Sequence, residues 1–254
     1  MKNNQIVINT LVLQHQHENG QTQIQLVDQL INAGIWNIEV RREYFKHNLR
    51  EMEALNHAKL GKRLTLFYSV PDVLFVDGEI NSRLTQYFSE ALLFGASYVK
   101  LNIGDFGTYK GDLKKEIEAI QPKNVQLDVE NDQTVLNGSA DNILAFLQSA
   151  RKDAVDIGFV NDLGNWIFTK QDAVQASQKL SSFTRYIHIK NYVLKGDKAE
   201  TVSIDQGLLD WKKLLDLNDP NLPVALEYPV DTMDNLKTDI GLLENYLESR
   251  QTKS

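Results

Sequence analysis

Short apolar runs rich in β-branched and aromatic residues alternate along this chain with longer stretches of helical spacing. This alternation is typical of parallel strands joined by crossover helices. In the stretch 83–94, for example, apolar residues recur every three or four positions, as on a helix face packed against a sheet. The period predicts eight strands, at residues 6–11, 36–41, 64–69, 98–103, 125–130, 157–162, 186–190 and 224–227.

Eight strand–helix units in 254 residues give 254/8, or about 32 residues per unit. A closed (β/α)₈ barrel typically takes ~250 residues, so the arithmetic favours a TIM barrel. The alternative is a doubly wound open sheet, which often carries a glycine-rich phosphate loop after its first strand. The sequence contains neither GxGxxG nor a Walker loop, and no linker or shift in composition divides it. We therefore expect one α/β domain, a TIM barrel, over residues 1–254.

Charge and composition narrow the function. The chain has 27 basic and 34 acidic residues, a formal net charge of −7, which disfavours nucleic acid as a partner. It has no cysteine, so any metal must be bound by oxygen and imidazole ligands. No apolar run approaches the ~18 residues of a membrane helix, and residues 1–20 lack the apolar core of a signal peptide. We expect a cytoplasmic protein that does not bind membranes.

Four predicted strands in succession place a polar residue at or near their carboxyl ends. These residues are Glu130, Asp162, His188 and Glu227, and the gaps between them are 32, 26 and 39 residues, close to one repeat each. The active site of a TIM barrel lies at this end of the strands. We therefore expect the four side chains to meet around one half of the barrel mouth, although a single acid at a strand end is more often a helix cap or a surface charge.

Three carboxylates and an imidazole brought together repel one another and are costly to desolvate unless a cation compensates them. A divalent metal is the simplest compensation. Oxygen ligands with one imidazole suit Mn²⁺, Mg²⁺ or Co²⁺, with Zn²⁺ also compatible, and the donor set alone does not select one.

Inward-facing positions on neighbouring strands add cations. Counting by twos places Arg41 on the face of Glu39 and Lys190 on the face of His188, and Lys100 points inward from the fourth strand. These three cations would suit a substrate carboxylate or phosphate. Alternatively, they are buried partners of nearby acids such as Glu39.

Other residues at the expected mouth are less specific. Trp166, beside Asn165, either stacks on a sugar face or covers the barrel rim. Ser69 ends the third strand, and because no base lies beside it in sequence we expect a substrate contact and not a nucleophile. The apolar segment 72–78 is predicted to be a loop, either a lid or a subunit contact, and exposed apolar residues make a homodimer plausible.

Five segments together resemble the xylose-isomerase-like sugar phosphate isomerase/epimerase superfamily, and within it the ketogluconate-utilisation epimerase group. They are IEVRREYF (38–45), VENDQT (129–134), NDLGNW (161–166), YIHIKN (186–191) and ALEYP (225–229). The resemblance runs from the second predicted strand to the eighth, and VENDQT and GNW are its most specific parts.

The resemblance implies a TIM barrel with a divalent metal held at Glu130, Asp162, His188 and Glu227. It also implies that Glu130 and Glu227 serve as base and acid, moving a proton next to a carbonyl through a metal-bound enediolate. Two positions depart from the pattern. Asn165 stands where many such epimerases have histidine, and Asn191 where many have an acid; Asn165 can bind a hydroxyl but cannot shuttle a proton.

The sequence therefore predicts a metal-dependent isomerase or epimerase of a small keto sugar, sugar acid or sugar phosphate, with substrate contacts at Glu39, Arg41, Ser69, Lys100, Asn165, Trp166 and Lys190. One alternative is a lyase, a dehydratase acting on a similar acid. The other is a non-catalytic sugar-binding protein whose acids are neutralised by Lys100 and Lys190 in place of a metal.

Overall fold

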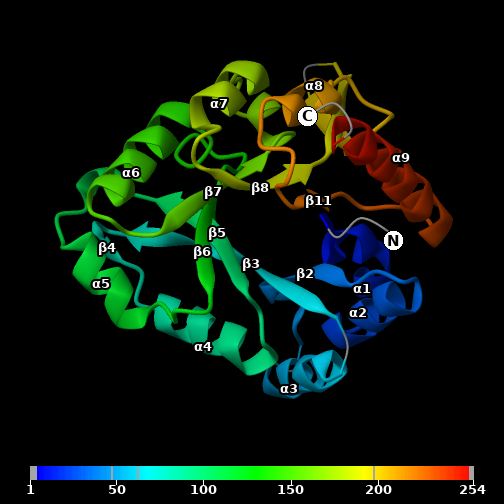
Figure 1. Ribbon diagram of the computed structural model, residues 1–254, viewed down its shortest axis with the longest axis horizontal. Coiled ribbons are helices and arrows are strands. Elements are labelled where there is room, and N and C mark those ends of the chain that lie inside the picture. Colours follow the sequence, from blue (N-terminus) through cyan, green and yellow to red (C-terminus); the bar gives the residue numbers. More distant parts are fainter. Residues whose placement is uncertain (1–4, 47, 62, 197, 252–254) are drawn as a thin grey trace.

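Eight parallel strands close into a barrel in the computed structural model of the chain, which describes residues 5–46, 48–61, 63–196 and 198–251 (Figure 1). The order around the barrel is β2, β1, β11, β8, β7, β6, β5 and β3, and pairing between β2 and β3 closes it. The fold prediction is confirmed. The barrel strands are β1 (Ile6–Asn9), β2 (Asn37–Arg41), β3 (Thr65–Val76), β5 (Tyr98–Gly104), β6 (Gln126–Glu130), β7 (Ile157–Asp162), β8 (Thr184–Ile189) and β11 (Val224–Leu226).

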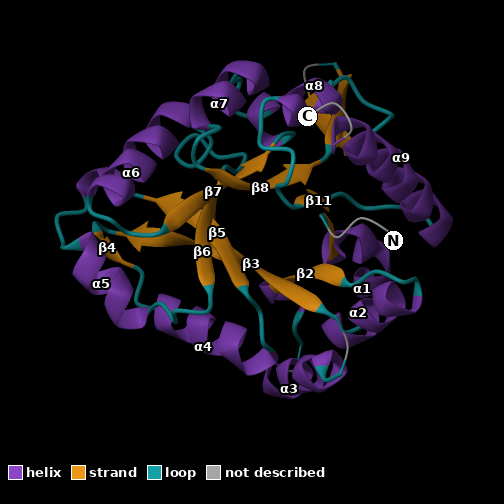
Figure 2. Ribbon diagram, in the orientation of Figure 1, coloured by secondary structure: helices purple, strands orange, loops and turns teal. Residues whose placement is uncertain are grey.

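Helices surround the strands as an outer ring (Figure 2). They are α1 (Gln14–Glu18), α2 (Gln23–Asn32), α3 (Asn48–Lys59), α4 (Leu84–Phe94), α5 (Leu113–Ile120), α6 (Ala140–Lys152), α7 (Ala173–Leu180), α8 (Trp211–Asp216) and α9 (Met233–Gln251). Short 3₁₀ turns follow several strands: η1 (Thr10–Leu13), η2 (Arg42–Tyr44), η3 (Phe106–Thr108) and η4 (Asn165–Ile167). In α4 the buried side chains include Leu84, Phe88 and Ala91, the stripe expected from the sequence. None of the helices in the described ranges is both long and apolar enough to cross a membrane.

Aromatic side chains fill the barrel toward the amino ends of its strands. The ring of Phe67 stacks on Tyr98 with centroids 4.3 Å apart and lies 5.0 Å from the ring of Tyr186. Tyr186 in turn meets the imidazole of His188 edge-on at 4.6 Å. This aromatic floor separates the amino end of the barrel from the polar residues at its carboxyl end.

Strand β3 continues beyond the point where the sequence predicts that it ends. Most of segment 72–78 is not a loop: β3 runs to Val76 and, after a turn at residues 77–78, pairs with β4 (Glu79–Ile80) in an antiparallel hairpin. The pairing of β3 with β5 shifts register between Ser69 and Val73, and Pro71 lies within this bulge. A bulge accommodates proline because its residues need not donate to the ladder.

A second hairpin follows β8 directly. Strands β9 (Asn191–Lys195) and β10 (Lys198–Val202) pair antiparallel outside the barrel. The eight-strand pattern did not predict this pair. It places Lys190 at the junction between a barrel strand and a hairpin.

Candidate functional site

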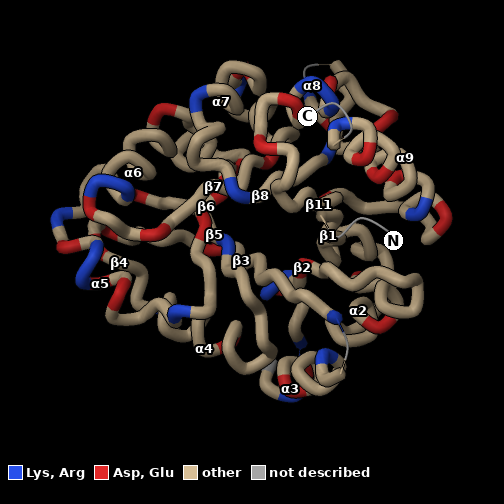
Figure 3. The backbone as a smooth tube through the Cα atoms, viewed as in Figure 1, with Lys and Arg blue, Asp and Glu red and all other residues tan. Residues whose placement is uncertain are grey.

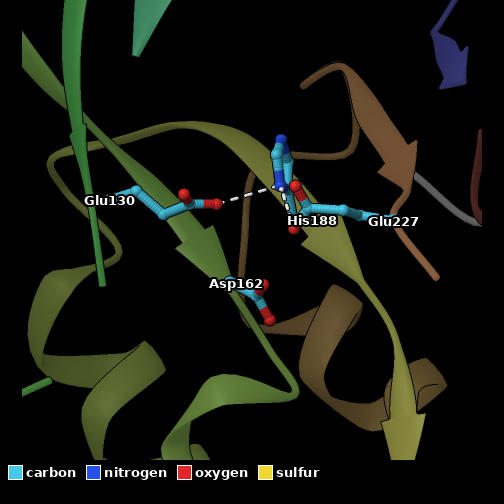
Figure 4. A group of neighbouring side chains, drawn as sticks. All are labelled: Glu130, Asp162, His188 and Glu227. Carbon is cyan, nitrogen blue, oxygen red and sulfur yellow. Dashed lines mark hydrogen bonds and ion pairs between the residues drawn. The ribbon is translucent and has the colours of Figure 1, made fainter. Parts of the chain in front are cut away.

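Four side chains from consecutive strands converge at the carboxyl end of the barrel, as the spacing predicts (Figure 4). Glu130 ends β6, Asp162 ends β7, His188 is the fifth residue of β8, and Glu227 directly follows β11. The register pairs Asp162 with His188 across neighbouring strands. Each residue offers a ligand atom, these atoms lie within 4.8 Å of one another, and all four residues are buried.

His188 lies between acids on both sides of its ring. Its Nδ1 is 2.9 Å from Oε1 of Glu130 and 3.1 Å from Oε2 of Glu227, and its Nε2 is 3.0 Å from Oε2 of Glu39. Burial opposes the charged imidazolium, but the carboxylates of Glu39, Glu227 and Glu130 outweigh it and raise the pKa of His188 well above its ordinary value. A carboxylate behind a histidine fixes which ring nitrogen faces a metal, and here Nδ1 faces the other ligand candidates.

Asp162 is held by the loop that follows its strand. Its Oδ1 accepts hydrogen bonds from the amides of Gly164, at 2.9 Å, and Asn165, at 3.1 Å, while Oδ2 lies 2.7 Å from Nζ of Lys190. Burial raises the pKa of Asp162 to about 6, although Lys190 acts in the opposite direction. Gly164 has no room for a side chain, because a methyl group there would lie 2.9 Å from the carbonyl oxygen of Lys190.

Lys100 reaches from β5 into the middle of the acids. Its Nζ contacts Glu130 directly and lies 3.5 Å from Oε1 of Glu227 and 3.7 Å from Oε1 of Glu39. Burial disfavours the charged amine, but Glu130, Glu227 and Glu39 outweigh it and raise the pKa of Lys100. Conversely, burial opposes ionisation of Glu227, yet Lys100 and His188 hold its pKa well below its usual range. Figure 3 shows charges of both signs on the barrel strands.

A cavity of about 420 Å³ opens above these residues. It is lined by Leu11, Arg41, Ser69, Val70, Pro71, Lys100, Asn102, Glu130, Asp132, Gln133, Thr134, Asn165, Lys190 and Glu227. Its volume is within the range of small-molecule sites, roughly 300–1,000 Å³. Glu130 and Glu227 line the cavity, and Asp162 and His188 are not among its lining residues, so the second pair lies deeper.

Most of the expected substrate contacts line this cavity, namely Arg41, Ser69, Lys100, Asn165 and Lys190. The cations also pair with acids, which was the alternative that the sequence left open. Arg41 donates from Nε to Glu43 at 2.6 Å and from Nη1 to Glu227 at 3.1 Å.

The structure does not bring Glu39 and Trp166 to the cavity surface. Both residues are fully buried. Trp166 packs at 6.4 Å from Phe159 and donates its indole N–H to Oδ1 of Asn161 at 3.0 Å, so it covers the barrel rim. Glu39 contacts His188 and Lys100 from below the cavity.

Asn9 is a site residue that the sequence reasoning missed. Its side-chain amide donates to Glu39 at 2.5 Å and to Glu227 at 3.0 Å, and so joins two of the acids. The strand-end signal was hidden, because the sequence predicts the first strand to run to residue 11, whereas β1 ends at Asn9. Asn191 serves a different purpose: its side chain donates to the carbonyl of Ile204 at 2.8 Å and accepts from the amide of Leu209 at 2.7 Å, which anchors the segment after β10.

The donor set fits a divalent metal. Oε1 of Glu130 and Oδ2 of Asp162 are buried and accept no hydrogen bond of good geometry from the described residues, although His188 and Lys190 lie close to them. Three carboxylates and one imidazole, with ligand atoms within 4.8 Å of one another, form a mixed oxygen and nitrogen set that Mn²⁺, Co²⁺ and Zn²⁺ accept.

No protein-family model and no curated protein sequence matches this chain. Solved structures do match it in fold. The probable 3-DHS dehydratase AsbF from Bacillus anthracis superposes with a TM-score of 0.71 at 17% identity, over 94% of this chain and 98% of that one. A D-tagatose 3-epimerase-like protein superposes with a TM-score of 0.71 at 15% identity, over 98% of this chain and 99% of that one. The IolI protein with a bound zinc atom superposes with a TM-score of 0.65 at 12% identity, over 98% of this chain and 95% of that one.

Proposed function

We propose that this chain, whose barrel fold is that of structures named as sugar epimerases and a dehydratase, is a divalent-metal-dependent isomerase or epimerase. Its proposed substrate is a small keto sugar, sugar acid or sugar phosphate. The observation that carries the proposal is the cluster of Glu130, Asp162, His188 and Glu227 beneath a cavity of about 420 Å³.

The four residues divide into two pairs. Asp162 and His188 lie below the cavity and are each oriented by neighbours, the first by backbone amides and the second by Glu39. We assign them mainly to holding the metal. A divalent ion held there would act as a Lewis acid and polarise a substrate carbonyl.

Glu130 and Glu227 are the proposed acid–base pair. Both line the cavity, and they come from β6 and from the end of β11, which two strands separate in the barrel order. They can therefore reach a bound substrate from different directions. One glutamate removes the proton next to the carbonyl and the other returns a proton, a type of catalysis that contributes typically 10²–10⁴-fold.

The cavity walls suit a polyhydroxylated or anionic ligand. Arg41 and Lys190 supply positive charge, and Ser69, Asn102 and Asn165 supply groups that bind hydroxyls. Asn165 also receives a hydrogen bond from Gln133 at 3.2 Å, which fixes its orientation at the cavity wall.

The first test is metal content by equilibrium dialysis against Mn²⁺, Co²⁺, Mg²⁺ and Zn²⁺, with Asp162→Ala as the control. About one ion per wild-type chain, absent from the control, is the expected result. The second test is incubation of the loaded protein with keto sugars and keto acids in deuterated water. Deuterium at a substrate carbon is expected, with loss of turnover in Glu130→Gln and Glu227→Gln.

The outcomes separate the alternatives. An unsaturated product in place of deuterium exchange would assign the chain to the lyases, as the dehydratase among the matching structures suggests. Full turnover in Glu130→Gln would refute the acid–base assignment. A folded wild-type protein that binds none of the four ions at millimolar concentration would refute metal dependence.

A further inference from the structure

Every carboxylate of the proposed metal site already has a cationic side chain beside it. Lys100 contacts Glu130 and lies 3.5 Å from Glu227. Lys190 lies 2.7 Å from Asp162 and 3.9 Å from Glu227. These lysines are themselves buried, with side chains 7% and 10% exposed, so solvent screens the contacts little.

The charges of the cluster come close to balance without a metal. Four carboxylates, Glu39, Glu130, Asp162 and Glu227, face the cations Arg41, Lys100 and Lys190, and His188 lies between the acids. Arg41 also pairs with a fifth carboxylate, Glu43. A divalent ion added to this arrangement would bring two further positive charges next to two ammonium groups. Entry of the ion therefore requires that at least one cation leaves the acids.

Lys100 is the side chain in the way. It contacts both Glu130 and Glu227, the two candidate ligands that also line the cavity, and it lines the cavity itself. Its flexible four-carbon stem would let the ammonium move from the acids toward the cavity that Lys100 lines. Lys190 is less free, because its stem and carbonyl pack against Gly164.

We propose that Lys100 is a built-in, displaceable cation that occupies the carboxylate cluster in the metal-free protein and competes with divalent metals for Glu130 and Glu227. This inference rests on the proposed metal site and adds a way in which the protein itself regulates metal binding there. The lysine keeps the empty cluster compatible with a stable fold, and it makes metal binding weaker and more readily reversible than the same four ligands would give alone.

The test is the affinity for Mn²⁺ of wild type and Lys100→Gln, measured by isothermal titration calorimetry and by electron paramagnetic resonance of free Mn²⁺. Glutamine removes the charge and keeps an N–H group that can donate to Glu130. Coupling between two binding events in one protein is typically 5- to 150-fold when they occupy separate sites, and we expect Mn²⁺ to bind Lys100→Gln tighter by a factor of roughly that size. Lys100→Arg keeps the charge and should not gain affinity.

Lys179→Gln is the matched control. Lys179 is also paired with an acid, at 2.5 Å from Asp141, but its side chain is 42% exposed and belongs to α7 on the outer ring. Its substitution should leave the Mn²⁺ affinity unchanged. Near-ultraviolet circular dichroism checks that each variant is folded, and a Lys100→Gln protein that folds only when Mn²⁺ is present would also support the proposal.

The proposal fails if folded Lys100→Gln binds Mn²⁺ no tighter than wild type, or if neither protein binds it. The first result, with wild type binding one ion through Asp162, would leave the proposed function intact. Binding by Lys100→Gln but not by wild type would support the inference and refute metal dependence of the wild-type enzyme.

Discussion

Substitution of Gly164 by alanine should destabilise the protein through one defined contact. Gly164 follows Asp162 by two residues, at the start of η4, and has φ of −84°, which alanine adopts without strain. Alanine lacks space here, because the added methyl group would lie 2.9 Å from the carbonyl oxygen of Lys190 and even closer to the Cγ atom of Lys190. Either the loop, whose amides donate to Asp162, or Lys190, whose Nζ contacts Asp162, must move.

Two opposing effects set the magnitude. Overpacking a close contact costs typically 1–3 kcal/mol, while replacing glycine restricts the unfolded chain and stabilises by about 0.4–1 kcal/mol. Because two atoms of Lys190 would lie within 3.0 Å of the added methyl group, we take the upper half of the overpacking cost, about 2–3 kcal/mol. The net expectation for Gly164→Ala is then a loss of about 1–2.5 kcal/mol in the free energy of unfolding. For a domain of this size each kcal/mol shifts the melting temperature by about 2–4 °C, so the expected fall is about 2–10 °C.

Urea denaturation and thermal melts of Gly164→Ala and Gly241→Ala test this reasoning. Gly241 lies within α9, and nothing is within 4 Å of the position its methyl group would take. Glycine inside a helix costs roughly 0.5–1 kcal/mol relative to alanine, so this control should be more stable than wild type. Gly164→Ala as stable as wild type, with an unchanged denaturant slope, would refute the steric argument.

Two further predictions concern buried carboxylates. Burial, opposed by Arg185, raises the pKa of Asp128 to about 6, so its contribution to stability is complete below about pH 4 and is lost as the pH rises through 6. Asp128→Asn should therefore gain stability relative to wild type between pH 4 and 7 in urea titrations, and a difference independent of pH would contradict this. Glu39→Gln removes the charged acceptor of His188 and should weaken Mn²⁺ binding by about 10–100-fold in equilibrium dialysis. Glu43→Gln, at the rim, is the control and should not weaken it. Equal Mn²⁺ affinities of Glu39→Gln and wild type would show that Glu39 does not support the metal site.

The strands and the four converging residues could be predicted from the sequence because both follow from periodicity. A strand-end residue repeated at about 32 positions must recur around the mouth of a barrel, whatever the loops do. Cross-barrel contacts could not be predicted in this way. Whether Lys100 turns toward Glu130 or toward solvent depends on side-chain torsions and on the width of the barrel, which no local pattern encodes.

The continuation of β3 was missed for a specific reason. Proline lacks an N–H group and normally marks the end of a strand, so the sequence places the end of β3 at Ser69, before Pro71. Tertiary pairing with β5 and β4 absorbs the proline in a bulge, and Asp72 accepts hydrogen bonds there from the amide of Val73 and the hydroxyl of Tyr87. The pairing with β5 is distant in sequence, but the pairing with β4 is local. Asp77 and Gly78, both with positive φ, form the two-residue Asp-Gly turn between β3 and β4, a hairpin signal that the sequence analysis overlooked.

Among the described residues, the aromatic floor of Phe67, Tyr98 and Tyr186 lies on the amino-end side of the proposed site, and the cavity of about 420 Å³ lies on its carboxyl-end side. In the proposed enzyme, ions, substrate and product would enter and leave through this cavity, and the acids proposed to bind the ion lie beneath the space proposed for the substrate. A sugar bound in the cavity would therefore lie between the ion and solvent. The metal would then exchange only after the product has left. The ion used in each turnover would be the one that bound before the sugar.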